Sequence, residues 1–100
     1  MIARVWNGTT ADGHAEAYVT HLREQTFPQL AKIEGHRGGY VLQRAHGGRV
    51  DFTVITLWDS FEAIRRFAGD PADVAVVPPA AQALLVSWDA QATHWEVALS

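Results

Sequence analysis

The sequence contains no cysteine, which excludes disulfide bonds, thiolate metal sites and catalysis by a cysteine nucleophile. It also has no apolar run near the roughly 20 residues that a membrane-spanning helix needs. Its opening residues show neither the charged region nor the apolar region of a signal peptide. The absence of cysteine suits a reducing compartment, so we expect a cytoplasmic protein without a membrane partner.

Positive charge is also scarce, because the chain has 8 lysines and arginines against 11 acidic residues and a net charge of −3. The basic residues are scattered along the chain, so no nucleic-acid partner is expected. No closely spaced histidine pair occurs either. His14 and His21 are seven positions apart, about 10.5 Å along a helix axis, which is too far to share a metal ion. We therefore expect no metal site.

What the chain does have is enough apolar material for one core. Its 100 residues are 48% hydrophobic, which predicts a single globular domain over residues 1–100. Strand-like patterns cover Ile2–Asn7, Gly38–Arg44, Arg49–Trp58 and Ala92–Leu99. Helical patterns run from Asp12, a candidate N-cap, to about Gln25, and from Ser60 to Ala68, where Asp59 or Ser60 caps the helix. Gly69 stops the second helix.

This order is βαββαβ, which predicts an α+β, ferredoxin-like fold with a four-stranded antiparallel sheet. The turn His46-Gly47-Gly48 joins the two central strands into a hairpin, and His36 is expected in a turn as well. Pro28 separates a short helical turn, Phe27–Ile33, from the first helix. The prolines of residues 70–86 forbid one continuous helix, so we expect a short helix near Ala72–Val76, a loop and an irregular alanine-rich segment.

The third predicted strand indicates a homodimer. Phe52, Val54 and Trp58 alternate with Ile55 and Leu57, so both faces of the strand are apolar. Two helices can cover only one face of a four-stranded sheet. The other face needs a partner, and a second copy of the chain is the simplest one.

Four segments resemble one family, the antibiotic-biosynthesis monooxygenase-like proteins. They are Ile55-Thr56-Leu57-Trp58-Asp59-Ser60-Phe61-Glu62-Ala63, Ile33-Glu34-Gly35-His36-Arg37-Gly38-Gly39-Tyr40-Val41, the opening Met1–Asn7 and the ending Thr93-His94-Trp95-Glu96-Val97. Together the segments span essentially the whole chain. They are strand ends and helix caps, so they are more specific for the fold than for an activity.

The resemblance implies a dimeric α/β barrel with a cavity between the sheet and the helices of each subunit. It also implies a cofactor-independent monooxygenase that oxidises an aromatic or polycyclic phenolic substrate with O₂. Fold does not fix function, so two alternatives stay open. One is a non-catalytic dimeric module that binds a small ligand, and the other is an isomerase or lyase-type enzyme of the same fold.

Some members of this family degrade haem, but the residues here argue against that activity. Those relatives combine an asparagine on the first strand with a tryptophan on the second helix and a histidine after it. When the chain is aligned through Trp58-Asp59-Ser60, these last two positions hold Phe67 and Val77. Valine cannot ligate iron, so we expect neither haem degradation nor a resident cofactor.

Residues on the first and last predicted strands suggest a polar site. If strands one and four are neighbours, Arg4 and Glu96 can pair across them, with Trp6 and His94 close by. A plain structural pair remains the alternative. As a catalytic set we expect His94 as base or hydrogen-bond partner, with Arg4 or Asn7 stabilising oxyanion charge.

Whether Asn7 or Trp6 faces the cavity depends on one residue of register, which the sequence does not give. Tyr18 lies in the buried stripe of the first helix and His21 lies at its edge, so both could reach a cavity or simply belong to the core. We expect substrate contacts from aromatic and imidazole side chains, namely Trp6, Tyr18, His21, Trp58 and Phe67.

Overall fold

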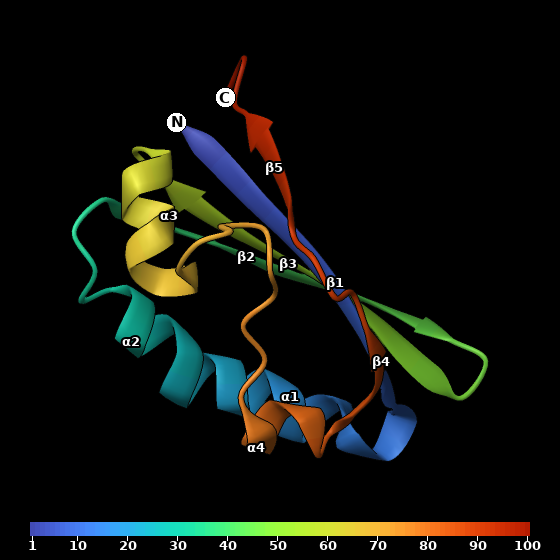
Figure 1. Ribbon diagram of the computed structural model, residues 1–100. Helices are drawn as coiled ribbons and strands as arrows, with labels where there is room; N and C mark the ends of the chain where they lie inside the picture. The colour runs from blue at the N-terminus through green and yellow to red at the C-terminus, as the bar shows by residue number, and fades with distance from the viewer.

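The computed structural model describes all residues, Met1–Ser100, as a sheet with its helices on one side (Figure 1). The strands are β1 (Ile2–Ala11), β2 (His36–His46), β3 (Arg49–Trp58), β4 (Leu85–Trp88) and β5 (Thr93–Glu96). The helical elements are η1 (Asp12–His14), α1 (Ala15–His21), η2 (Leu22–Thr26), α2 (Phe27–Leu30), α3 (Phe61–Ala68) and α4 (Pro79–Gln82). No helix has the length and the hydropathy that crossing a membrane requires.

The sheet is antiparallel, with strand order β2-β3-β1-β4, and β5 pairs with β1 as well. β4 and β5 occupy the same edge of β1, opposite its last and its first residues respectively. The predicted ferredoxin-like α+β fold is therefore confirmed. The predicted fourth strand, Ala92–Leu99, is wrong in its bounds, because only Thr93–Glu96 pairs with β1 and Leu85–Trp88 supplies the other half of this edge.

β2 is longer than predicted, since it runs from His36 to His46 rather than from Gly38 to Arg44. His36 and His46 are therefore strand residues and not turn residues, and the turn consists of Gly47-Gly48. The register of β2 on β3 shifts between His36 and Gly39. A Cβ on Gly39 would lie 1.9 Å from the carbonyl oxygen of Ile55, so only glycine allows the two backbones to approach this closely.

The first helical stretch differs from the single helix predicted from Asp12. Asp12 opens a 3₁₀ turn and makes no N-cap hydrogen bond, α1 begins at Ala15, and a π-helical turn follows over Leu22–Thr26. Pro28 lies at the first turn of α2, where its missing N–H costs least, as expected. The wide π turn lies directly before this proline. It rotates the side chains that follow away from the positions that a 3.6-residue wheel assigns to them.

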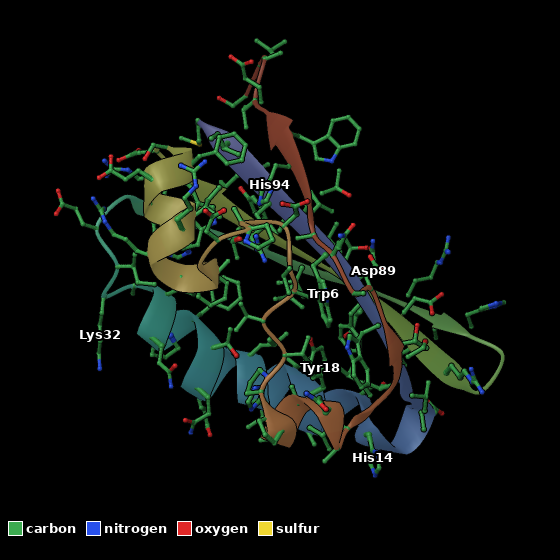
Figure 2. All side chains as sticks on the ribbon, in the orientation of Figure 1. Trp6, His14, Tyr18, Lys32, Asp89 and His94 are labelled. Atoms are coloured by element: carbon green, nitrogen blue, oxygen red, sulfur yellow. The ribbon has the colours of Figure 1, made fainter.

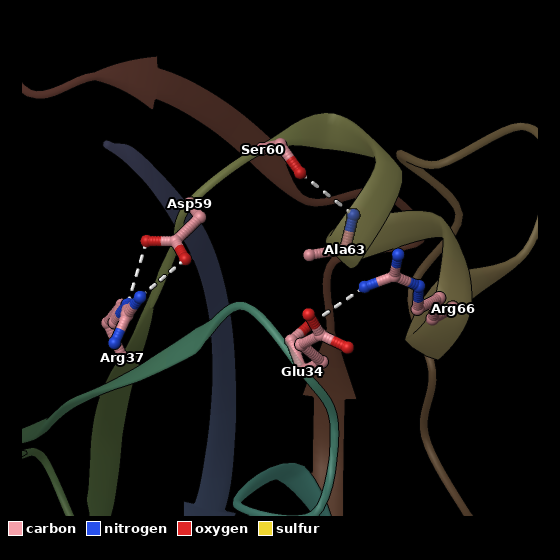
Figure 3. Close-up of polar contacts among 6 residues, drawn as sticks. All are labelled: Glu34, Arg37, Asp59, Ser60, Ala63 and Arg66. Atoms are coloured by element: carbon pink, nitrogen blue, oxygen red, sulfur yellow. Dashed lines mark hydrogen bonds and ion pairs between the residues drawn. The ribbon is translucent and has the colours of Figure 1, made fainter.

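α3 begins and ends as the sequence predicts. The Ser60 hydroxyl accepts a hydrogen bond of 3.2 Å from the backbone N–H of Ala63 (Figure 3). Gly69, at φ 79°, follows the last turn. Asp59 has a different partner, because both of its carboxylate oxygens accept hydrogen bonds of 2.7 Å from Arg37. This exposed ion pair fastens the start of β2 to the end of β3.

The segment between α3 and α4 makes a turn at Ala72 and Asp73 and contains no helix over Ala72–Val76, contrary to the prediction. We call residues 70–78 the strap. It runs alongside the chain between β4 and β5, with a bridge between Val74 and Gln91 and a hydrogen bond from the N–H of Ala92 to the carbonyl of Asp73. These long-range bonds replace the local ones of a helix, and they were not visible in the order of residues.

The covered face of the sheet is the one that meets the helices. Every second residue of β3, from Val50 to Trp58, is buried there, while the residues between them are only half-buried. The buried core residues form two clusters. One comprises Tyr18, Leu22, Val50, Phe52, Val54, Ala81 and Leu85, and the other comprises Leu30, Trp58, Ala63, Ile64 and Ala72.

The other side of the sheet, which we call the open face, has no element packed on it (Figure 1). Three large apolar side chains of this face are well exposed. Tyr40, Leu42 and Trp95 are 63%, 51% and 61% exposed. Ile55 and Leu57 of β3 lie between these outer residues. An apolar area of this kind on a sheet is typical of a surface that binds a partner.

Candidate functional site

A cavity of about 580 Å³ lies between the covered face and the helical layer. Residues of both core clusters line it, together with part of the strap, and most of the lining is apolar. Its volume falls in the range of sites that hold small organic ligands. The cavity is therefore the candidate site, and its few polar groups decide which chemistry it can support.

β1 presents Arg4 and Trp6 to this cavity, because alternate residues of a strand share a face. The indole N–H of Trp6 donates a hydrogen bond of 2.8 Å to the carbonyl of Asp89, which fixes the ring. Figure 2 shows Trp6 and Tyr18 between the sheet and the helices. The register therefore puts Trp6, and not Asn7, on the cavity side.

Asn7 belongs to the open face, in a polar group of its own. Its side-chain amide donates to the carboxylate of Asp89 at 3.0 Å and accepts a hydrogen bond of 2.7 Å from the Thr53 hydroxyl. Asn7 is exposed and does not line the cavity. Its predicted part in stabilising an oxyanion has no geometric support in this arrangement.

α1 contributes Tyr18 and His21 to the opposite wall. The Tyr18 ring meets Phe52 edge to face at 4.9 Å, and burial raises the pKa of its hydroxyl far above the ordinary value, so it stays neutral. The ring of His21 stacks on Tyr18 at 6.5 Å, and its Nε2 atom is buried without a hydrogen-bond partner. This wall presents two flat rings, which can pack against a flat molecule.

Arg4 is the one buried charged residue of the lining, with 5% of its surface exposed. Its Nη1 donates to the carbonyl of Ala72 and lies 2.9 Å from Nε2 of His94, and its Nη2 donates to the carbonyl of Val74 at 3.0 Å. The Phe67 ring lies 5.7 Å from the guanidinium carbon. Burial lowers the pKa of Arg4, although the charge of Asp73 acts in the opposite direction.

His94 lies beside Arg4, nearer the end of the sheet that holds both termini (Figure 2). A guanidinium only donates hydrogen bonds, so Nε2 of His94 must accept and the ring must be neutral with its proton on Nδ1. Burial and the charge of Arg4 lower the pKa of His94, while Asp73 raises it. His94 lines a separate hollow of about 320 Å³, beside Phe61 and Trp95, and not the main cavity.

The predicted pair of Arg4 with Glu96 does not form. In the register of β1 and β5, Arg4 lies opposite His94, and Glu96 lies opposite Ile2. Glu96 is exposed, and the acceptors for Arg4 come from the strap and from His94. The prediction is wrong because Arg4 donates to carbonyls of the strap and contacts His94, which the sequence did not show.

Trp58 lies behind the cavity wall. It is fully buried, its indole donates to the Thr56 hydroxyl at 2.9 Å, and its ring stacks on Phe67 at 5.9 Å. Among the predicted residues, the structure thus brings five together in the lining and leaves Asn7, Trp58 and His94 outside it. The five are Arg4, Trp6, Tyr18, His21 and Phe67. Their roles stay predictions.

Several lining residues were not predicted. Gln25 and Gln29 follow His21 on the helical layer, and Val77 and Pro78 belong to the strap. The glutamines were missed because the π turn shifts the inward face of the helix. A signal for this was present in Pro28, which disturbs regular helical hydrogen bonding in the preceding turn. No group of three or more histidine, aspartate or glutamate side chains is placed to hold a metal ion.

No family model matches the chain, and no curated protein matches it either. Solved structures do match its fold. A Bacillus cereus protein assigned as an antibiotic biosynthesis monooxygenase has a TM-score of 0.70 and 18% identity, over 100% of this chain and 94% of its own. The haem degrader MhuD of Mycobacterium tuberculosis, with two haems in its active site, has a TM-score of 0.66 and 19% identity, over 100% and 98%. The chain thus shares the fold of these proteins over its whole length.

Haem fits the lining residues poorly. Val77, which the sequence resemblance aligns with an iron-binding histidine, lines the cavity and has no ligand atom. His21 is the lining histidine, and its Nε2 atom is buried rather than open to the cavity. The lining therefore does not offer an axial histidine to a haem iron.

Proposed function

We propose that the chain is a cofactor-independent monooxygenase that oxidises an aromatic, phenolic molecule held in the cavity. The observation that carries the proposal is a ligand-sized, mostly apolar cavity with a single buried cation, Arg4, in its lining. The likeness in fold to an antibiotic biosynthesis monooxygenase supports the same assignment. Flat walls from Trp6, Tyr18 and Phe67 suit a ring system.

The reaction needs no external reductant. With an anthrone-type substrate, the ring CH₂ group and one O₂ molecule give a carbonyl group and one water molecule. The substrate supplies all the electrons, one oxygen atom enters the product and the other leaves as water. The step starts from the substrate anion, so the protein must stabilise negative charge on the substrate oxygen.

Arg4 is the residue placed to stabilise that charge. It lines the cavity, whereas Asn7, the other candidate, lies on the open face. His94 reaches the cavity only through Arg4, and its Nε2 is already engaged. We therefore assign His94 to positioning Arg4, in place of the role of base that the sequence suggested.

Oxygen uptake with anthrone and a panel of related phenols tests the activity. The parent protein should consume O₂, and Arg4→Met should lower the rate by about 10²–10³, the usual loss when one group that stabilises an oxyanion is removed. The matched control is Arg37→Met, which removes an exposed arginine outside the cavity and should leave the rate unchanged. No uptake by the parent protein with any phenol would contradict the proposal.

Two substitutions at His94 separate positioning from proton abstraction. His94→Gln keeps an oxygen that can accept a hydrogen bond from Arg4 and should retain most of the rate, whereas His94→Ala should lose much of it. A true base would be lost equally in both variants. Equal loss of activity, with both variants folded, would return His94 to the role of base.

A non-catalytic binding module is the second candidate. The observation that favours it is the lack of an available base, since the Tyr18 hydroxyl is held neutral and Nε2 of His21 is buried. Tight binding of aromatic ligands without any oxygen uptake would support this function.

We also propose that two copies associate through the open face. The exposed side chains of Tyr40, Leu42 and Trp95 give this face an apolar surface that water would otherwise cover. A two-fold symmetric pairing would cover both copies at once. Sedimentation equilibrium at micromolar concentration should give twice the chain mass of 11.0 kDa, and a monomer at all concentrations would contradict the pairing.

A further inference from the structure

Two arginines border the cavity, and their surroundings differ. Arg66 is about half exposed and donates to the Glu62 carboxylate at 3.2 Å. It also donates to the carbonyl of Glu34 at 3.0 Å (Figure 3). Arg4 is buried and has no carboxylate partner. Asp73, the acid whose charge acts on Arg4, is exposed and forms no ion pair with it. The cavity therefore contains a positive charge that has no ion-pair partner in the protein.

The hydrogen bonds of Arg4 leave part of the guanidinium free. Of the five N–H groups of an arginine, the two on Nη1 are used by the carbonyl of Ala72 and by His94, and one on Nη2 is used by the carbonyl of Val74. The Nε–H and the second Nη2–H have no protein partner. Adjacent guanidinium nitrogens of this kind can bind both oxygens of a carboxylate, or one phenolate oxygen.

The surroundings hold the guanidinium in place without cancelling its charge. Phe67 lies over it, and the neutral acceptors of the strap and of His94 fix its orientation. A buried ion without a counter-ion is costly, so an arrangement of this kind is stabilised when an anion binds. The rest of the lining is mostly apolar, which favours a ligand with a single negative charge over a phosphate dianion.

We infer that the cavity selects ligands that carry one ionised oxygen group, a carboxylate or a phenolate, which sits on Arg4 while an apolar ring system fills the remaining space. The inference rests on the proposed function in taking this cavity as the substrate site. It adds that the substrate is bound as an anion and that its neutral counterpart is rejected.

Isothermal titration calorimetry with 2-naphthoate and 2-naphthamide tests the selection, since the two probes have nearly the same shape and differ in charge. At pH 7 the parent protein should bind naphthoate at least about tenfold more tightly, as expected for hydrogen bonds to a charged group. Equal affinities, or tighter binding of the amide, would overturn the inference.

Variants locate the selection on one residue. Arg4→Met should bind the two probes equally, and Arg66→Met should keep the preference for naphthoate. If Arg4→Met does not fold, because Arg4 also holds the strap, Arg4→Lys keeps the charge and should retain a reduced preference. A full preference in Arg4→Met, or its loss in Arg66→Met, would contradict the assignment.

The binding test and the oxygen-uptake test can succeed or fail independently. A preference for naphthoate together with no oxygen uptake would uphold the anion site and leave the binding module as the function. Oxygen uptake without any preference for the anion would uphold the oxygenase and overturn the selection at Arg4.

Discussion

The covered and open faces of the sheet are both rich in apolar side chains, yet only the covered face is buried. On β3, Trp58 and Phe52 are buried beneath the helices, while Ile55 and Leu57 on the open face are only half-buried. The helical layer explains the difference, because it lies on one side of the sheet. Apolar character thus shows that a face needs cover, whereas the order of elements decides which face the chain covers itself.

The largest expected effect separates two tryptophans on opposite faces. Trp58 is 0% exposed and Trp95 is 61% exposed. Trp58→Ala should lower the free energy of unfolding by about 3–5 kcal/mol because it leaves a cavity in the core. Trp95→Ala should cost less than about 1 kcal/mol when unfolding in urea is measured at concentrations where the chain is monomeric. Equal losses would mean that the two faces contribute alike to the stability of the single chain.

A second comparison uses two neighbouring residues of β2 that point to opposite sides. Leu42 lies on the open face and Gln43 on the other, and both are exposed. Leu42→Asp should raise the dissociation constant of the dimer by about 30-fold or more, as expected for a charge placed within an apolar interface. Gln43→Asp is the matched control and should change it little. Sedimentation velocity over a range of concentrations measures both, and equal weakening would place the interface elsewhere.

A smaller effect is expected on the free energy of unfolding as the pH changes, because of two histidines on the covered side. Burial lowers the pKa of His94 and of His36 below the ordinary 6.5, and Arg4 lowers that of His94 further. Below about pH 6.5 the unfolded chain therefore binds more protons than the folded chain, so the free energy of unfolding should fall as the pH decreases from 7 to 5. At His94, Asp73 opposes this effect, while Phe61 only packs against the ring.

Denaturant unfolding at several pH values measures this dependence. His94→Gln should flatten the curve, and the pH dependence that remains should be the part due to His36. A stability that rises on acidification, or a curve unchanged in His94→Gln, would contradict the contact between His94 and Arg4.

Local signals were enough to predict much of the fold. The alternation of Arg49–Trp58, the turn at Gly47-Gly48 and the Ser60 cap each depend on neighbouring residues, and the structure has all three. The strap and β4 could not be predicted in the same way. Leu85 pairs with Thr10, and the strap bonds to residues near Gln91, so their conformations depend on partners that are distant in the sequence.

The candidate site shows the same contrast between features that local patterns predict and features that depend on distant partners. Strand periodicity indicated that Arg4 and Trp6 share a face, and the helical stripe indicated that Tyr18 points inward, which the lining of the cavity confirms. The sequence predicted the wrong partner for Arg4, Glu96 in place of His94. The register of β5 on β1 depends on the path of the chain through Asp89–Ala92, which no local pattern gives. Val77 was missed because only the strap brings it to the cavity.

The central claim is that ligand binds in the cavity of the covered side, beside Arg4. Each of the 4 tryptophans gives an indole N–H signal in a ¹H–¹⁵N NMR spectrum, and two of them, Trp6 and Trp95, report on opposite faces. Titration with 2-naphthoate should shift the Trp6 signal and leave the Trp95 signal in place. A shift of Trp95 without a shift of Trp6 would put the ligand on the open face and contradict the account.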